Sequence, residues 1–351
     1  MRAATSKRRK QFFLIILAFL VLLLIPISIA WGWYKASIID IIRVLVMPDN
    51  SVLSTIVWDL RLRRILAGIV IGAILGGSGA AIQASMRNPL ASPFTFGLSF
   101  AASLGVAVAL LVLHGGAIQR YQILIYDPFM VSAFAFIFSL IQVAVVLLLA
   151  YKAGLSAGTL VLSAIAISFV YQAILYLLQY FYLNEILVST VVFWTFGDLG
   201  RISWFELGIV GVVAIAVVVP YFIIKSLDFD LILGGDDLAK SSGVSPKRLR
   251  LETTIIAALA TALATSFVGV IGFVCLAAPH IARFLFGGGH RYLMPASMLM
   301  GSSILTLSDT IGRNVIAPTM IPVGVMTSLV GAPLLVYLLL GVNKRGYRDH
   351  R

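Results

Sequence analysis

The sequence carries very little charge: 11% of its 351 residues are Asp, Glu, Lys or Arg, whereas 60% are hydrophobic. Soluble domains carry roughly a quarter charged residues, so the polar surface is too small for a water-soluble globule. A single cysteine, Cys275, excludes an internal disulfide and a cysteine-based metal cluster. Apolar stretches follow one another from residue 11 to residue 342. We therefore expect one all-α membrane domain over residues 1–351.

Groups that would drive catalysis or ion coupling are also missing from the sequence. It has no G-x-x-x-x-G-K-[ST] loop to cradle the phosphates of ATP, so hydrolysis by that route must come from another protein. The apolar stretches hold almost no ionisable side chain of the kind that a proton- or ion-coupled transporter uses. The four histidines are scattered, and none stands at metal-ligand spacing from another. We expect no catalytic residue, no metal site and no cofactor.

Ten stretches are apolar enough to cross a bilayer as helices of about 20 residues. The expected spans are 11–33, 65–86, 93–113, 128–151, 159–181, 205–225, 252–270, 271–286, 293–310 and 323–342. The stretch 252–286 is too long for one helix, and Gly269, Gly272 and Pro279 are its possible break points. The first stretch could instead be a signal peptide with a cleavage site at Ser28-Ile29-Ala30, although it is long for one.

The net charge is +12, but the basic residues lie between the apolar spans and do not form one basic face on a folded domain. This argues against nucleic-acid binding. With the N-terminus placed inside, 8 of the 26 lysines and arginines fall outside and the other 18 inside. The eight are Lys35, Arg43, Arg61, Arg63, Arg64, Arg120, Arg201 and Arg313. Positive charge favours the cytoplasmic side. We expect a multi-pass protein of the cytoplasmic (inner) membrane, with a cytoplasmic N-terminus at 1–10 and a cytoplasmic tail at 343–351.

The second stretch reads Gly68-x3-Gly72-x3-Gly76-Gly77-x-Gly79, with a small residue on almost every turn. Such a face lets helix backbones approach closely in lipid, either for packing alone or beside a pathway. A polar turn, Asn88-Pro89-Leu90, follows it. Irregular backbone at this depth is tolerated only inside protein or along an aqueous space. The turn is therefore a candidate for lining a translocation pathway.

Arginines precede the second and the last spans on the expected outer side, against the topological preference. They are Arg61, Arg63 and Arg64 before the second span, and Arg313 before the last. Guanidinium groups suit the carboxylates of a partner protein. They also commonly anchor helix ends at the interface, and the sequence leaves both readings open.

The longest polar loop on the expected inner side covers 226–250. Asp236 and Asp237 favour a helix start, Gly243 favours a stop, and Pro246 favours a new start. We expect one or two short helices that dock into a partner, the alternative being a solvated loop.

Four stretches, in this order, resemble the FecCD permease family. They are Arg61-Leu62-Arg63-Arg64 continuing to Gly97, the loop ending Gly243-Val244, residues 268–274 with 278–283, and residues 321–325 with 331–333. The resemblance implies a type II ABC importer permease of about ten transmembrane helices with both termini cytoplasmic. The implied function is a pathway for a ferric siderophore or a related metal chelate, haem or cobalamin. The implied partners are a second copy or a paralogous permease, two cytoplasmic ABC ATPase subunits and an extracytoplasmic substrate-binding protein, besides membrane lipid.

The resemblance also implies roles for particular residues. Binding-protein docking falls to Arg61, Arg64 and Arg313, although Arg63 stands where the family usually has proline. Coupling to the ATPase falls to Asp236, Asp237, Leu238, Ser242, Gly243 and Val244. The cytoplasmic gate and pathway fall to Asn88, Leu90, Ser156, Ala157 and Gly158. His280 and Arg283 belong to the family signature, and we expect them to pack near the coupling surface.

Two rival functions remain. One is an autonomous ion-coupled secondary transporter, which would work without an ATPase. The other is a membrane enzyme acting on a lipid-soluble substrate, which would need a cluster of catalytic groups at one membrane face.

Overall fold

The computed structural model describes residues 2–114 and 128–346, and this part of the chain is built of helices without a strand. The elements are α1 (Arg2–Ala30), α2 (Ile38–Val46), α3 (Val52–Thr55), η1 (Ile56–Leu62), α4 (Arg63–Ser85), η2 (Pro93–Phe96), α5 (Leu98–His114), α6 (Pro128–Lys152), α7 (Ala157–Tyr182), α8 (Glu185–Thr195), α9 (Trp204–Val213), η3 (Ala214–Val218), α10 (Val219–Ile224), α11 (Ser226–Leu233), α12 (Asp236–Ser241), α13 (Pro246–Val268), α14 (Val274–Phe286), α15 (His290–Asn314) and α16 (Val323–Gly346). The predicted all-α fold is confirmed.

Each of the ten expected spans contains a helix. By length and composition, six helical stretches can cross a membrane: Lys7–Ala30, Val52–Ser85, Pro128–Lys152, Ala157–Tyr182, Trp204–Ile224 and Pro246–Val268. Shorter apolar helices lie at Leu98–Val112, Glu185–Thr195, Val274–Phe286 and Val323–Pro333. The expected span 293–310 falls on α15, whose many serine, threonine and charged residues keep it out of both groups.

Some helix ends differ from the sequence-based expectation. The basic segment 1–10 is helical from Arg2 because it continues α1, and α16 runs on to Gly346, into the expected tail. Residues 347–351 and Arg120 lie outside the described residues. The sequence reasoning missed α2 and α8 because both are too short to give a span signal.

The long apolar stretch 252–286 breaks between α13 and α14. Gly269 has a φ of +81°, which favours glycine, and it follows directly on α13. The carbonyl of Val268 accepts a hydrogen bond from Asp198 N at 2.7 Å, so the loop after α8 fastens the broken end. Pro279, the third expected break point, lies inside α14.

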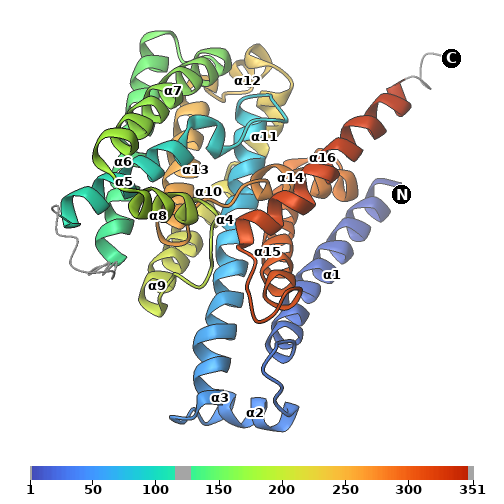
Figure 1. The fold of residues 1–351 in the computed structure, drawn as a ribbon. Helices are drawn as coiled ribbons and strands as arrows, with labels where there is room; N and C mark the ends of the chain where they lie inside the picture. The colour runs from blue at the N-terminus through green and yellow to red at the C-terminus, as the bar shows by residue number, and fades with distance from the viewer. Residues whose placement is uncertain (1, 115–127, 347–351) are drawn as a thin grey trace.

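Helix α4 runs through the middle of the bundle, with α13, α14 and α15 against it (Figure 1). The glycine stripe makes the contact with α15. A β-carbon on Gly76 would lie 2.1 Å from the carbonyl oxygen of Ser297, and one on Gly301 would lie 2.0 Å from that of Gly72. No side chain fits there, so the predicted close packing is confirmed and the two helices form a tight pair.

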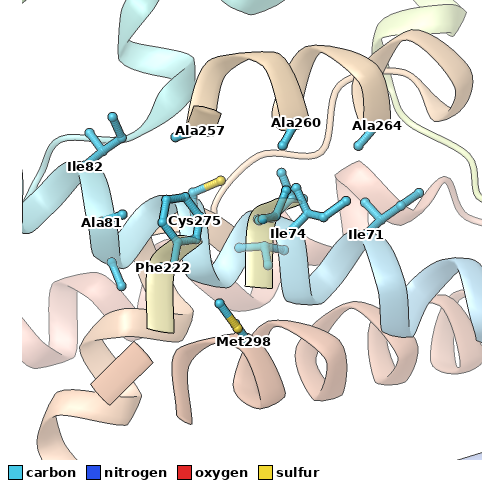
Figure 2. Close-up of a cluster of buried hydrophobic side chains, with 14 of the residues drawn as sticks. Ile71, Ile74, Ala81, Ile82, Phe222, Ala257, Ala260, Ala264, Cys275 and Met298 are labelled. Atoms are coloured by element: carbon cyan, nitrogen blue, oxygen red, sulfur yellow. The ribbon is translucent and has the colours of Figure 1, made fainter. Parts of the chain in front are cut away.

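The opposite side of α4 packs on α13 through small side chains. Ala257, Ala260 and Ala264 of α13 face Ile71 and Ile74 of α4, and all five are buried (Figure 2). Alanine on one helix against isoleucine on the other lets the backbones approach while filling the space between them.

The two ends of the bundle carry different structures (Figure 1). Helices α11 and α12 lie at one end, called here the hairpin end, and α2 and α3 lie at the opposite end, called the α2 end. The start of α1 belongs to the hairpin end, since Lys10 Nζ lies 5.8 Å from the ring centroid of Tyr292 in the first turn of α15.

Candidate functional site

The loop 226–250 forms two short helices, α11 and α12, as expected. Asp236 and Asp237 lie in the first turn of α12, and Gly243 follows it with a φ of +84°. Pro246 opens α13. The tip is open to solvent: the side chain of Asp237 is fully exposed, and Leu238 is 49% exposed.

A buried arginine fastens α12 to the membrane helices. Arg250 of α13 is 4% exposed, and its Nη1 and Nη2 donate to the two carboxylate oxygens of Asp236 at 2.9 and 2.6 Å. Its Nε donates to the carbonyl oxygen of Ser85, the last residue of α4, at 3.2 Å. The hydrogen bonds from Arg250 hold the pKa of Asp236 below its usual value. Arg250 therefore joins α12, α13 and α4.

A second carboxylate fastens α11 to α15. Asp230 Oδ1 accepts hydrogen bonds from His290 N at 2.9 Å and from His290 Nδ1 at 2.7 Å. His290 is the first residue of α15, and Gly289 before it has no side chain to cap the helix. Asp230 thus supplies the N-terminal cap from another helix, where negative charge also matches the helix dipole. His290 itself is fully buried.

A cavity of about 460 Å³ lies between α12 and the turn before α7. Ser156, Asp236, Gly243 and Val244 all line it, so the structure brings one expected gate residue next to three expected coupling residues. Ser156 caps α7 by accepting a hydrogen bond from Thr159 N, with Ala157 and Gly158 forming the first turn between them.

The turn after α4 holds the other expected gate residues. Asn88 Oδ1 accepts a hydrogen bond from Leu90 N at 2.9 Å, and Asn88 N donates to the carbonyl of Gln83 at 3.1 Å. Leu90 is 59% exposed. The turn therefore continues from the end of α4 that Arg250 holds, and its gating role stays a prediction.

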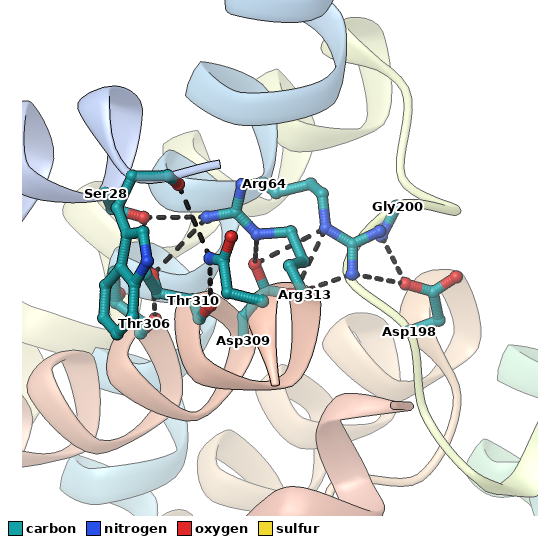
Figure 3. A network of polar contacts seen from close by, with 10 residues as sticks. Ser28, Arg64, Asp198, Gly200, Thr306, Asp309, Thr310 and Arg313 are labelled. Carbon is teal, nitrogen blue, oxygen red and sulfur yellow. Dashed lines mark hydrogen bonds and ion pairs between the residues drawn. The ribbon is translucent and has the colours of Figure 1, made fainter. Parts of the chain in front are cut away.

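A charged network joins α4 to α15 near the α2 end (Figure 3). Arg64 Nη2 lies 2.7 Å from Asp309 Oδ1 and 2.8 Å from Asp198 Oδ1, and Arg313 Nε lies 3.0 Å from Asp309 Oδ2. Gly200 N donates to Asp198 Oδ1 at 2.9 Å. Asp309 is 3% exposed and the two arginines are nearly as buried. A buried charge needs such partners, since an unpaired one is costly.

Arg61 is buried in a different way. It is 4% exposed, and its Nη1 and Nη2 donate to the carbonyl oxygens of Ile29 at 2.6 Å and Tyr34 at 2.8 Å. No carboxylate of the described residues lies in ion-pair contact with it. The turn between α1 and α2 covers it, because a β-carbon on Gly32 would clash with the guanidinium group.

The predicted docking arginines are therefore inaccessible in this structure. Arg64 and Arg313 are occupied by carboxylates of the same chain, and Arg61 is occupied by backbone carbonyls. Their docking role stays a prediction, and it now requires that the outer turns move aside or exchange partners. Sequence reasoning missed this burial because Asp309 lies 245 residues from Arg64, and Ile29 and Tyr34 lie 32 and 27 residues from Arg61. The Arg313–Asp309 pair, in contrast, is only four residues apart.

His280 and Arg283 of α14 are partly buried near the hairpin end. His280 Nδ1 lies 2.7 Å from the carbonyl oxygen of Leu276, and Arg283 Nη2 donates to Gln83 Oε1 at 3.4 Å. Arg283 thus also contacts the last turns of α4. Among the described residues, no group of three or more His, Cys, Asp or Glu could hold a metal ion.

The FecCD transport family matches residues 20–341. The chain belongs to this family. It is 40% identical over 339 residues to MJ0087 of Methanocaldococcus jannaschii, which is named as an ABC transporter permease, and the match covers 96% of this chain and 97% of that one. It is 33% identical over 340 residues to YfmE of Bacillus subtilis, a permease protein of an Fe(3+)-citrate import system, covering 97% and 98%.

A solved structure agrees with the family. It is described as a metal-chelate type ABC transporter in an inward-facing conformation, and it superposes with a TM-score of 0.80 at 27% identity, covering 94% of this chain and 99% of that chain. The predicted FecCD resemblance and the ABC importer permease architecture are confirmed. The chain is a multi-pass permease of the ABC importer class.

Three residues of the hairpin end were missed by the sequence reasoning: Arg250, Asp230 and His290. In the sequence, Arg250 is one of many basic residues on the expected inner side, and Asp230 is one residue of the polar loop 226–250. A buried arginine 14 residues after Asp236 carries no sequence signal. Gly289 before His290 was the available hint, since a glycine at the N-cap has no side chain to satisfy the first N–H groups of the helix.

Proposed function

We propose that this chain forms the membrane pathway of an ATP-driven importer for a ferric siderophore or a related metal chelate, with haem and cobalamin in the same class. The observation that carries the proposal is the attachment of α11 and α12 to the α4–α15 pair through Arg250 and Asp230. A polar hairpin fixed to the central helices is a device for receiving force from another protein. The ferric-citrate relative and the metal-chelate structure support the choice of cargo.

The hairpin end faces the cytoplasm in this proposal, and the α2 end faces outward. Supporting this orientation, the basic start of α1 lies at the hairpin end beside α15, and positive charge favours the cytoplasmic side. The membrane is the cytoplasmic membrane. The nucleotide-hydrolysing partner is a pair of ABC ATPase subunits, which contact the exposed tip of α12 at Asp237 and Leu238, with Ser242 and Gly243 beside it.

Transport proceeds by alternating access. Closure of the ATPase pair displaces α11 and α12. Arg250 passes the displacement of α12 to the end of α4, and Asp230 passes the displacement of α11 to the start of α15. The glycine contacts keep α4 and α15 together, so the pair moves as one body. The gate turns at Asn88 and Ser156 adjoin these attachments and open or close with them.

The pathway itself needs a second subunit, either another copy of this chain or a paralogue. A hollow of about 560 Å³ on the described chain is lined mainly by apolar and small residues of α8, the 270–272 segment and α16. A wall without charged residues suits a bulky chelate that arrives with its metal already coordinated. We place this wall on the pathway.

The substrate-binding protein docks at the α2 end. Arg61 is the best placed of the three docking arginines, because no carboxylate of the described part of the chain pairs with it. A carboxylate of the binding protein could replace the two backbone carbonyls once the turn between α1 and α2 shifts. Arg64 and Arg313 contribute by exchange with Asp309 and Asp198.

Reconstitution tests the function. The chain is placed in lipid vesicles alone, and separately with its ATPase subunits and the loaded binding protein, and uptake of the iron-labelled chelate is measured. We expect uptake only in the complete system and only with ATP. Uptake by the chain alone, driven by a proton or sodium gradient, would instead establish the secondary-transporter alternative.

A further inference from the structure

Helix α2 presents three different faces. At 3.6 residues per turn, side chains four apart lie above one another. Ile41 and Val44 are buried against the protein, and Asp40 and Arg43 form an exposed polar face. The third face, led by Ile42, is apolar and exposed. Its members are Ile38, Ile39, Ile42 and Val46, all more than half exposed.

An exposed apolar face of this kind is unusual on a short helix that is surrounded by water. Four large aliphatic side chains on nine residues leave a continuous apolar strip with a charged residue on only one side. Exposed apolar strips of this kind mark contact with a membrane or another protein. The position of α2 relative to the spans decides between them.

Two contacts place α2 at the boundary of the membrane. Trp58 Nε1 donates to the carbonyl oxygen of Val44 at 2.9 Å, and the ring of Trp58 lies 6.2 Å from the ring of Trp204. Trp204 begins the 21-residue span Trp204–Ile224, whose length matches the bilayer core. Tryptophan is enriched at membrane interfaces. Helix α2 therefore adjoins an interfacial tryptophan pair.

The end of α1 also places α2 at the boundary of the membrane. The span Lys7–Ala30 ends directly before Trp31, Trp33 and Tyr34, three exposed aromatic side chains of the kind found in interfacial belts. Along α1 the exposed side chains, among them Leu22 and Ile27, form the surface that faces lipid. The chain then enters α2 within four residues, so the apolar strip of α2 continues that surface past the belt.

We propose that α2 is an interfacial helix that lies on the outer leaflet of the bilayer, with its Ile38–Ile42–Val46 strip inserted among the lipids. Amphipathic helices with one apolar face bind the headgroup boundary in this way. Asp40 and Arg43 then point to water and headgroups, and the arginine can reach a lipid phosphate. The partner is the phospholipid surface, and the helix holds the turn that covers Arg61 against it.

Spin labels on introduced cysteines test this placement, since the natural Cys275 is buried and leaves no reactive background. Ile42→Cys and Ile38→Cys are compared with the matched controls Asp40→Cys and Arg43→Cys on the same helix. Each labelled protein is reconstituted in vesicles of phosphatidylethanolamine and phosphatidylglycerol. The accessibility of the label to oxygen, which concentrates in lipid, is measured against that to a water-soluble nickel complex.

We expect the oxygen-to-nickel ratio to be several-fold higher at Ile38→Cys and Ile42→Cys than at the two controls. Equal ratios at all four positions would show that α2 stands clear of the bilayer and would overturn the proposal. A second arm adds the binding protein. In the permease without the binding protein, the Ile42→Cys label could instead be accessible to the nickel complex and become shielded only when the binding protein is added. The apolar strip would then be a contact surface for the binding protein, and the proposal would be overturned. All four sites are exposed, so labelling leaves the packed face of α2 intact.

Discussion

The two ends of the α4–α15 pair hold their charges in opposite ways. At the α2 end, Asp309 is 3% exposed and lies between two buried arginines of the same chain. At the hairpin end, Asp236 and Asp230 each have 36% of the side chain exposed, while their partners Arg250 and His290 are buried. Screening by water makes an exposed pair weaker than a buried one of the same geometry. The outer network is therefore suited to holding the helices together until a docking partner exchanges with it, and the inner joints are suited to receiving a pull from a partner.

The middle of the pair connects these two ends. The close approach at Gly72, Gly76 and Gly301 leaves no room for a side chain between the two helices. In the proposed mechanism, a displacement applied to the inner joints reaches Arg64 and Asp309 through this closely packed pair. The following predictions test this contrast, beginning with the largest expected effect.

Removing the central carboxylate of the outer network should destabilise the protein more than any of the other substitutions. Asp309→Leu leaves Arg64 and Arg313 buried without their shared partner, and breaking a buried pair in this way destabilises by about 3 to 5 kcal/mol. We expect a large drop in the melting temperature of the detergent-solubilised protein. Asp237→Asn, at a fully exposed carboxylate, is the control and should melt like the parent. Equal melting of Asp309→Leu and the control would mean that the network locks nothing.

Separating the two helices in their middle should cost less. Gly76→Ala places a methyl group against the carbonyl of Ser297, and overpacking of this kind costs about 1 to 3 kcal/mol. The same change at Gly211, where an added β-carbon would meet no described atom within 4 Å beyond its own helix backbone, should be neutral or slightly stabilising. Thermal melting of both variants checks the prediction. Equal tolerance at the two glycines would show that α4 and α15 are not tightly joined.

Loosening the inner joint on α15 should have a smaller and more local effect. Asp230→Ala removes the cap of α15, and losing a cap costs about 1 kcal/mol. We expect faster amide hydrogen exchange in the first turn of α15, with exchange at the Asp309 end unchanged. Asp228→Ala on the same helix, whose carboxylate pairs only locally with Lys225, is the control. Unchanged exchange at His290 would show that Asp230 does not cap the helix.

The joint at Asp236 should give the smallest effect, and the size of this effect should depend on pH only in acid. The hydrogen bonds from Arg250 lower the pKa of Asp236 in the folded protein. The ionised carboxylate therefore contributes its full stabilisation at any pH above its ordinary pKa of 3.8, and this contribution is lost as the pH falls from 3.8 through the lowered value. From neutral pH down to 3.8, melting temperatures of the parent and of Asp236→Asn should therefore run parallel. Below it, the difference between them should shrink. A gap that closes already near neutral pH would contradict the Arg250 contact.

The sequence predicted the features that depend on neighbouring residues. The glycine stripe indicated close helix packing, and the spacing of Asp236, Gly243 and Pro246 indicated the short helices of the hairpin. The sequence could not predict which charged residues pair, because Arg64 and Asp309 are 245 residues apart and Asp230 and His290 are 60 residues apart. Arg61 and Arg64, expected at an open surface, proved to be buried against partners that are distant in the sequence, whereas Arg313 is buried beside Asp309, four residues away. Helix α2 was missed because a nine-residue apolar segment is too short to be told from a loop.

The most direct test of the account is the number of ATP molecules hydrolysed per chelate imported, measured in vesicles that hold the chain, its ATPase subunits and the binding protein. The double variant Asp230→Ala/Asp236→Asn releases both inner joints while leaving the exposed tip of α12 to bind the ATPase. We predict continued ATP hydrolysis with several-fold less import, whereas Asp228→Ala, which leaves both joints and the α12 tip intact, keeps the parent ratio. An unchanged ratio in the double variant would contradict the claim that these joints carry the force to the membrane helices.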